Sequence, residues 1–200
     1  ERISALKMLA EESSCTIITT FDGLMNPMPM PEKFIREVKK VSVGDILNLE
    51  ELTKHLVELG YEKNYQAETM GEFSVRGGIL DIFPLTEDNP FRIEFWGDEV
   101  DSIRSFDAES QRSIENLEEI SIYPACELVL TAEERQEGIK RILKEADKVS
   151  AKLRKEMKTE EAHRTKSAAA QIAEEAGELG ISAGLDAYLS YFCEERVSLL

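Results

Sequence analysis

The sequence lacks the short motifs on which enzyme chemistry usually depends. It contains no GxxxxGK[ST] phosphate loop, no GxGxxG turn, no HExxH and no paired CxxC. Its two histidines, His55 and His163, fall in helical segments without a nearby nucleophile or metal ligand, so solvent-exposed helix positions explain both. The many carboxylates could supply an acid/base pair, but in so acidic a chain they more simply form a solvated face. We therefore expect no catalytic residues, no cofactor and no metal in this chain.

Cysteines and long apolar runs are also scarce. The three cysteines, Cys15, Cys126 and Cys193, are odd in number and widely spaced, as is typical of reduced thiols in a cytoplasmic protein. No apolar run approaches the length of a membrane span, and no signal-peptide pattern is present. The chain begins in the middle of a pattern and stops in an apolar run. We expect a piece of a longer cytoplasmic protein that does not bind membranes.

Basic residues are rare in the middle of the chain. The net charge is −16, and residues 41–129 hold twenty acidic and six basic side chains, a net charge of −14. Such a surface repels phosphate backbones, so this segment is a poor nucleic-acid binder by itself. The same imbalance makes a few isolated cations conspicuous. They are Arg76, Arg92, Arg104 and Arg112.

The clearest strand patterns lie in residues 71–106. Apolar and polar residues alternate in 72–76 and again in 91–96, which predicts strands with one buried and one outer face. The residues expected on the buried face are Phe73, Val75, Phe91, Ile93 and Phe95. Those expected on the outer face are Glu72, Ser74, Arg76, Arg92, Glu94 and Trp96.

Glycines and proline punctuate these strands. Gly97-Asp98 predicts a tight hairpin turn, Gly77-Gly78 allows a kink, and Pro84 ends the apolar run 79–83. Asp81 lies within that run, where a buried carboxylate needs donors, so we expect a hydrogen bond to backbone or to an arginine. The returning strand repeats its apolar residues every three positions, which predicts a bulge. These residues are Val100, Ile103 and Phe106.

Helices and further strands flank the sheet. Asn48 predicts the cap of a helix that ends at Gly60, and Thr131 begins a capping box before a second helix. The other expected elements are an amphipathic helix at 1–12 (Ile3, Leu6, Met8, Leu9), a buried strand at 15–20, an extended connector at 26–31, a strand at 38–43, one or two strands within 114–122, and helices at 159–178 and from 185. The apolar stripe of the helix after Thr131 is Ile139, Ile142, Leu143, Ala146, Val149, Leu153 and Met157, which we interpret as a packing surface.

The outer face of the predicted sheet is the candidate binding site. Trp and Arg dominate interface hot spots, and Trp96 lies beside Arg92 on that face. The alternative is that neighbouring helices cover Trp96 and that Arg92 simply pairs with Glu94.

The motifs GEFSVRGGILDIFP, PFRIEFWGDEVDSIRSFD and ESQRS resemble the UvrB-like amino-terminal region of the bacterial transcription-repair coupling factors, the Mfd family. UvrB shares the GEFxVRGxxxDIFP and RIEFxGDE patterns. Gly78-Ile79 and the segment 106–113 favour Mfd over UvrB. The resemblance implies an α/β and α+β fold with three parts. They are the carboxyl-terminal part of a degenerate helicase-like α/β subdomain (1–37), an antiparallel-sheet UvrA-binding domain with a helix (38–123) and a helical remainder (124–200).

The resemblance also implies a function. The sheet would dock UvrA through Arg76, Arg92 and Trp96, with Glu94 and Arg104 as neighbours, and alanine at any of the first three would weaken docking without unfolding the module. The parent family is an ATP-dependent DNA translocase that uses ATP and Mg in other domains, releases stalled RNA polymerase and delivers repair to DNA lesions. The docking face would be open to masking by another domain. Two other classes stay open: the equivalent region of UvrB, and a structural lever.

Overall fold

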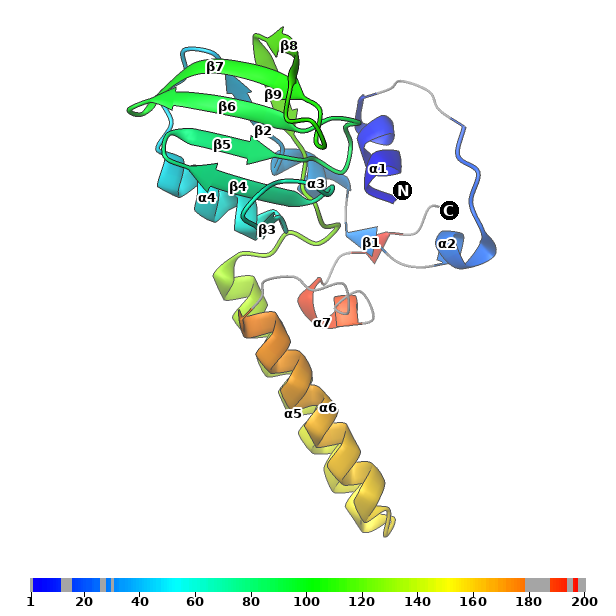
Figure 1. Ribbon diagram of the computed structural model, residues 1–200. Helices are drawn as coiled ribbons and strands as arrows, with labels where there is room; N and C mark the ends of the chain where they lie inside the picture. The colour runs from blue at the N-terminus through cyan, green and yellow to red at the C-terminus, as the bar shows by residue number, and fades with distance from the viewer. Residues whose placement is uncertain are drawn as a thin grey trace. The chain divides into compact units, whose positions relative to one another are not determined.

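The computed structural model describes residues 2–11, 16–25, 28–29, 31–178, 188–193 and 196–197 (Figure 1). The chain divides into two compact units, residues 1–129 and residues 130–197. The helices of the first unit are α1 (Arg2–Glu11), α2 (Phe21–Met25), α3 (Pro31–Arg36) and α4 (Leu49–Glu58). Its strands are β1 (Met28–Pro29), β2 (Lys39–Ser42), β3 (Glu62–Lys63), β4 (Glu72–Arg76), β5 (Ile79–Ile82), β6 (Phe91–Trp96), β7 (Glu99–Phe106), β8 (Ser113–Leu117) and β9 (Glu119–Ile122).

A six-stranded sheet organises the first unit. Its strand order is β3-β4-β5-β6-β7-β8, with β3 parallel to β4 and every other pair antiparallel. A separate antiparallel pair, β2 with β9, lies with α4 behind this sheet in Figure 1. The predicted mixed helix and sheet class is confirmed, and two strands, β8 and β9, form where one or two were predicted within 114–122.

The core lies between the sheet and the elements behind it. It includes Leu56 of α4, Phe73 and Ile93 of the sheet, and Val41 and Ile122 of the β2–β9 pair, all 0% exposed. Every residue predicted for the buried face either belongs to this cluster or packs against it. The outer face, defined as the opposite face of the six-stranded sheet, has no described helix over it in Figure 1.

Local signals at both ends explain α4. The Asn48 side chain accepts hydrogen bonds from the backbone N–H groups of Glu50 and Glu51, both at 3.1 Å, which confirms the predicted cap. Gly60 takes φ +90° just after the helix, where a residue with a side chain would be strained. On α4, Leu52 and Leu56 are buried, whereas Val57 is exposed.

The predicted bulge lies in β7. Glu94 pairs with Ser102 but Phe95 pairs with Val100, so one step on β6 matches two steps on β7 and Asp101 is the extra residue. This bulge lets Val100 and Ile103 both enter the core. Phe106 is buried but does not belong to that core cluster.

One expectation for the first forty residues, the strand at 15–20, is wrong, whereas the helix expected at 1–12 is confirmed as α1. Residues 16–20 form no strand, and Ile18 is 95% exposed, because no described strand pairs with this run and a β-branched segment is buried only where neighbours accept its hydrogen bonds. In α1, Leu6 is buried but Met8 and Leu9 are exposed. Of the connector expected at 26–31, β1 occupies Met28 and Pro29, and Asn26, Pro27 and Met30 lie outside the described residues. Pro31 begins α3, because the first turn of a helix tolerates a proline.

The second unit is built on a helical hairpin, α5 (Ala132–Lys155) and α6 (Thr159–Glu178), with α7 (Leu189–Phe192) and β10 (Arg196–Val197). The predicted capping box at Thr131 is confirmed by reciprocal hydrogen bonds with Glu134. The buried residues of the two long helices are mostly small: Gly138, Ile142, Ala146 and Ser150 on α5, and Ala162, Ala169 and Ala176 on α6. Three residues of the predicted stripe, Leu143, Val149 and Met157, are exposed. The start of the last helix, expected near Leu185, lies outside the described residues.

Candidate protein-docking face

Cross-strand pairing arranges the outer face in three rows. The first row contains Ser74, Asp81, Arg92, Arg104 and Asn116. The second contains Arg76, Ile79, Glu94 and Ser102. The third, at the tip of the β6–β7 hairpin, contains Trp96, Glu99 and Ile46. Directly opposed residues project to the same side of a sheet, so all three rows share the outer face.

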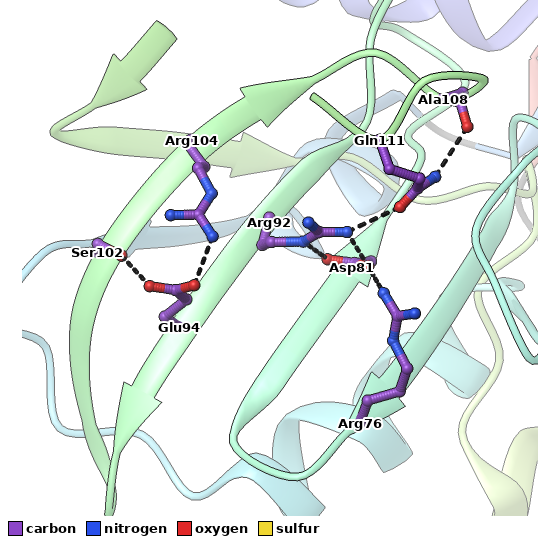
Figure 2. Close-up of polar contacts among 8 residues, drawn as sticks. All are labelled: Arg76, Asp81, Arg92, Glu94, Ser102, Arg104, Ala108 and Gln111. Carbon is purple, nitrogen blue, oxygen red and sulfur yellow. Dashed lines mark hydrogen bonds and ion pairs between the residues drawn. The ribbon is translucent and has the colours of Figure 1, made fainter. Parts of the chain in front are cut away.

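Asp81 of the first row connects the first two rows, because its carboxylate binds Arg92 of the first row and Arg76 of the second. Its carboxylate is 1% exposed and accepts two hydrogen bonds from Arg92, Nε to Oδ1 at 2.6 Å and Nη2 to Oδ2 at 2.8 Å (Figure 2). Arg76 donates a third from Nη2 to Oδ2 at 2.8 Å. Charge-assisted bonds of this kind satisfy a carboxylate that would otherwise be costly to bury. The prediction that an arginine donates to Asp81 is confirmed, and two arginines do so.

Arg92 is the more enclosed of these two arginines. Its side chain is 13% exposed, and its guanidinium carbon lies 4.4 Å from the centroid of the Phe106 ring. Nη2 also donates to Oε1 of Gln111 at 2.9 Å. The hydrogen bonds to Asp81 raise the pKa of Arg92, with the charges of Asp81 and Glu94 adding to the effect, although burial alone would lower it. Arg92 is therefore a permanently charged part of the sheet and offers little surface to a partner.

A short loop, residues 107–112, presents Gln111 to Arg92. The Asp107 carboxylate accepts from the hydroxyl and the backbone N–H of Ser110, and these bonds lower the pKa of Asp107. Gln111 adopts φ +60°, an uncommon left-handed conformation for a residue with a side chain. Its amide nitrogen donates to the carbonyl of Ala108 at 2.8 Å (Figure 2), which leaves its oxygen turned toward Arg92.

Glu94 and Arg104, the expected neighbours, form a second cluster. Arg104 is paired with Glu94, whose carboxylate also accepts from the hydroxyl of Ser102 at 3.0 Å (Figure 2). The alternative in which Arg92 simply pairs with Glu94 is wrong, because cross-strand register places Asp81 directly opposite Arg92.

Trp96 is the most accessible of the predicted site residues. It is 82% exposed, immediately before Gly97, which takes φ +66° in the two-residue turn of the predicted hairpin. The alternative in which helices cover Trp96 is therefore wrong for the described part of the chain. The Arg76 side chain is 41% exposed even though it contacts Asp81. The structure thus places Arg76, Arg92 and Trp96 on one face, as predicted, but the arginines are not free cations.

Sequence reasoning missed several residues of this site, among them Gln111 and Ile46. Gln111 depends on an unusual backbone conformation that no local pattern announces. Ile46 reaches the face through an isolated bridge to Glu99, more than fifty positions away in the chain. Its position two residues before the Asn48 cap carried no strand signal.

The described residues hold no group of three His, Cys, Asp or Glu side chains suited to a metal ion. Likewise, none of the described helices combines the length and the apolar character that a membrane crossing needs. What the outer face offers instead is an exposed indole, a half-exposed guanidinium and a fixed network beneath them. This arrangement suits recognition of another macromolecule.

Comparison with known proteins identifies the domain. Residues 40–128, which contain the whole outer face, match the family described as the UvrB interaction domain. Over all 200 residues the chain is 36% identical to the transcription-repair-coupling factor of Bacillus subtilis, of which it covers 17%. Over 191 residues, 96% of the chain, it is 32% identical to UvrABC system protein B of Thermosipho africanus, of which it covers 29%. The transcription-repair-coupling factor of Staphylococcus aureus (strain bovine RF122 / ET3-1) is 38% identical over 133 residues, which are 66% of the chain and 11% of that protein.

The chain therefore carries a UvrB interaction domain. More particularly, the chain is similar over its whole length to part of a transcription-repair-coupling factor, which confirms the resemblance drawn from the sequence motifs. It spans less than a third of the length of each of these relatives.

Proposed function

We propose that this chain is a protein-recruitment module of nucleotide excision repair and that its outer face docks UvrA. The observation that carries the proposal is Trp96, 82% exposed on a hydrogen-bonded hairpin, on the same sheet face as the half-exposed Arg76. An indole supplies apolar area at low entropic cost, and a guanidinium recognises a carboxylate in a defined geometry. The match of residues 40–128 to the UvrB interaction domain supports the same assignment.

In this proposal the two arginines have different roles. Arg76 contacts UvrA directly, because much of its side chain is accessible and a single hydrogen bond holds it to Asp81. Arg92 acts through Asp81: its paired hydrogen bonds fix the carboxylate that orients Arg76. Asp81 neutralises one of the two cations, so the cluster presents a net charge of +1.

Titration of purified UvrA with the 200-residue chain tests the proposal. Replacing the single tryptophan by 5-fluorotryptophan gives one ¹⁹F resonance, from Trp96, which should shift and broaden on binding. We expect Trp96→Ala and Arg76→Ala each to weaken binding by about 1–3 kcal/mol, the usual hot-spot range.

Matched controls separate docking from general surface effects. Tyr65 is an aromatic residue with 85% exposure outside the three rows, and Arg164 is an exposed arginine of the second unit. Tyr65→Ala and Arg164→Ala should bind UvrA like the wild type. Equal, wild-type affinity in Trp96→Ala and Arg76→Ala would refute docking by this face.

The intact protein would add the motor that this chain does not contain. We propose that it is an ATP-driven DNA translocase that releases stalled RNA polymerase, with this module recruiting UvrA afterwards. The equivalent region of UvrB is the second candidate, because the chain aligns with UvrB over 191 residues. For the isolated chain we expect UvrA binding without ATP turnover and with negligible DNA affinity. Measurable turnover or tight DNA binding would favour the UvrB-type function instead.

A further inference from the structure

The tip of the β6–β7 hairpin is flanked on both sides by exposed apolar residues. Glu99 of β7 is opposed by Trp96 on one side and by Ile46 on the other. Ile46 is 72% exposed and Trp96 is 82% exposed. Neighbouring strands lie about 4.8 Å apart, so the two apolar residues stand roughly 10 Å from each other on the same face.

Hydrogen bonds hold Ile46 firmly in place. The segment before α4 bonds to β7 and its turn through Gly44 N to Val100 O at 2.8 Å, Val100 N to Asp45 O at 2.9 Å and Leu47 N to Asp98 O at 2.7 Å. The Asp45 carboxylate accepts from the backbone of Ser42 at 2.8 Å. Leu47 packs against the core, so its neighbour Ile46 points outward. A β-branched residue on a fixed backbone loses little entropy when a partner covers it.

We infer that Ile46 is a second apolar anchor of the docking face, which places Trp96 at the centre of the surface that UvrA covers. The inference rests on the proposed function. Following the rows across the sheet, Arg76 and Ile46 lie about 20 Å apart with Trp96 between them. A standard interface buries about 800 Å² per partner, a patch roughly 30 Å across, so one partner covers all three residues.

The surrounding charge defines the partner surface. Glu99 is exposed between the two apolar residues, and Asp98 and Asp101 are exposed close to it in the chain, in a stretch with a large excess of acids. Desolvated apolar centres with charged rims are typical of specific interfaces. The part of UvrA that meets this end of the face should therefore be apolar with a rim of Lys or Arg, whereas the part that meets Arg76 should carry a carboxylate.

Substitution of Ile46 in the 200-residue chain tests this inference. We expect Ile46→Ala to raise the Kd for UvrA about 5- to 30-fold, the scale of a moderate hot spot. Ile46→Arg should weaken binding further, because the new cation meets the basic rim of the partner. Ile46→Met should keep the Kd within about threefold of wild type, because a size-conserving apolar substitution is well tolerated. Val57→Ala on α4 is the control, since Val57 is also an exposed branched apolar residue but lies outside the three rows.

The outcomes distinguish the two proposals. Weakened binding by Ile46→Ala with unchanged binding by Val57→Ala supports the second anchor. Wild-type binding by Ile46→Ala, while Trp96→Ala is weakened, overturns the anchor and leaves UvrA docking intact. Wild-type binding by Trp96→Ala and Arg76→Ala as well overturns docking by the whole face.

Discussion

The two arginines that contact Asp81 should differ sharply in what they contribute to stability. Arg92→Ala removes two of the three charge-assisted hydrogen bonds to a carboxylate that is 1% exposed. Breaking a buried ion pair costs about 3–5 kcal/mol, because the remaining charge stays desolvated. Arg76 remains as a partner, so we expect Arg92→Ala to lower the free energy of unfolding by about 2–4 kcal/mol.

Arg76→Ala should cost much less. It removes one hydrogen bond, its side chain is 41% exposed, and Asp81 keeps both bonds from Arg92. Exposed ion pairs contribute about 0–1 kcal/mol, so we expect a loss of no more than about 1 kcal/mol. The sequence-based expectation that neither substitution disturbs the module should therefore hold for Arg76 and fail for Arg92.

Amide hydrogen exchange is the appropriate assay. Exchange in peptides from β5 and β6 reports opening of the sheet, whereas the helical signal of circular dichroism is dominated by the hairpin of the second unit. The double variant Arg92→Met with Asp81→Leu is the control, because replacing a buried ion pair by apolar residues of similar size is often neutral. Equal opening free energies for Arg92→Ala and Arg76→Ala, within about 0.5 kcal/mol, would refute this hierarchy.

Two further predictions concern Glu72 and the helical hairpin. Burial alone would raise the pKa of Glu72, but hydrogen bonds from Thr69, Glu68 and Asn64 lower this pKa below its ordinary value of 4.5. The ionised Glu72 carboxylate therefore stabilises the folded state above pH 4.5, and this stabilisation is lost as the pH falls through the lowered pKa. In urea unfolding followed by near-UV circular dichroism, Glu72→Gln should be less stable than wild type at neutral pH, and the difference should vanish in acid; a constant difference would contradict this. Gly138→Ala should destabilise the second unit by about 1–3 kcal/mol, because the added Cβ would lie 2.0 Å from the ring of the buried Phe192. Gly177→Ala, whose added Cβ would have nothing within 4 Å, should be neutral or stabilising by up to about 1 kcal/mol. Thermal unfolding at 222 nm compares them, and equal shifts in both would argue against the packing of Phe192 on α5.

The parts of the fold that were predictable are those that local patterns specify. The alternation in 72–76 and 91–96 identified the buried and outer faces because side chains alternate along a strand. Asn48 and Gly60 bounded α4 because capping chemistry is local. Residues 16–20 have the composition of a strand but form none, because strand formation depends on neighbours that a local pattern does not reveal.

The candidate site was predictable in membership but not in organisation. Period two placed Arg76, Arg92 and Trp96 on one face. The pairing of both arginines with Asp81 depends on the register of three strands, which a period alone does not specify. The position of Phe106 beneath Arg92 depends on how the alternation of side chains along β7 resumes after the bulge at Asp101. The position of Ile46 on the outer face depends on its long-range bridge to Glu99.

The charge arrangement explains how a face in so acidic a segment can be selective. Binding a nucleic-acid backbone requires several cations along a track, and its affinity grows with each phosphate neutralised. On the strands of this face, Arg104 is paired with Glu94 and Arg92 is enclosed by Asp81 and Gln111, which leaves Arg76 as the accessible guanidinium. A partner with one well-placed carboxylate beside an apolar, basic-rimmed surface fits this pattern, whereas a polyphosphate meets one accessible guanidinium in a segment with twenty acids and six bases. The excess of acids therefore acts as a repulsive element against the wrong class of partner, and Asp81 fixes the one attractive position.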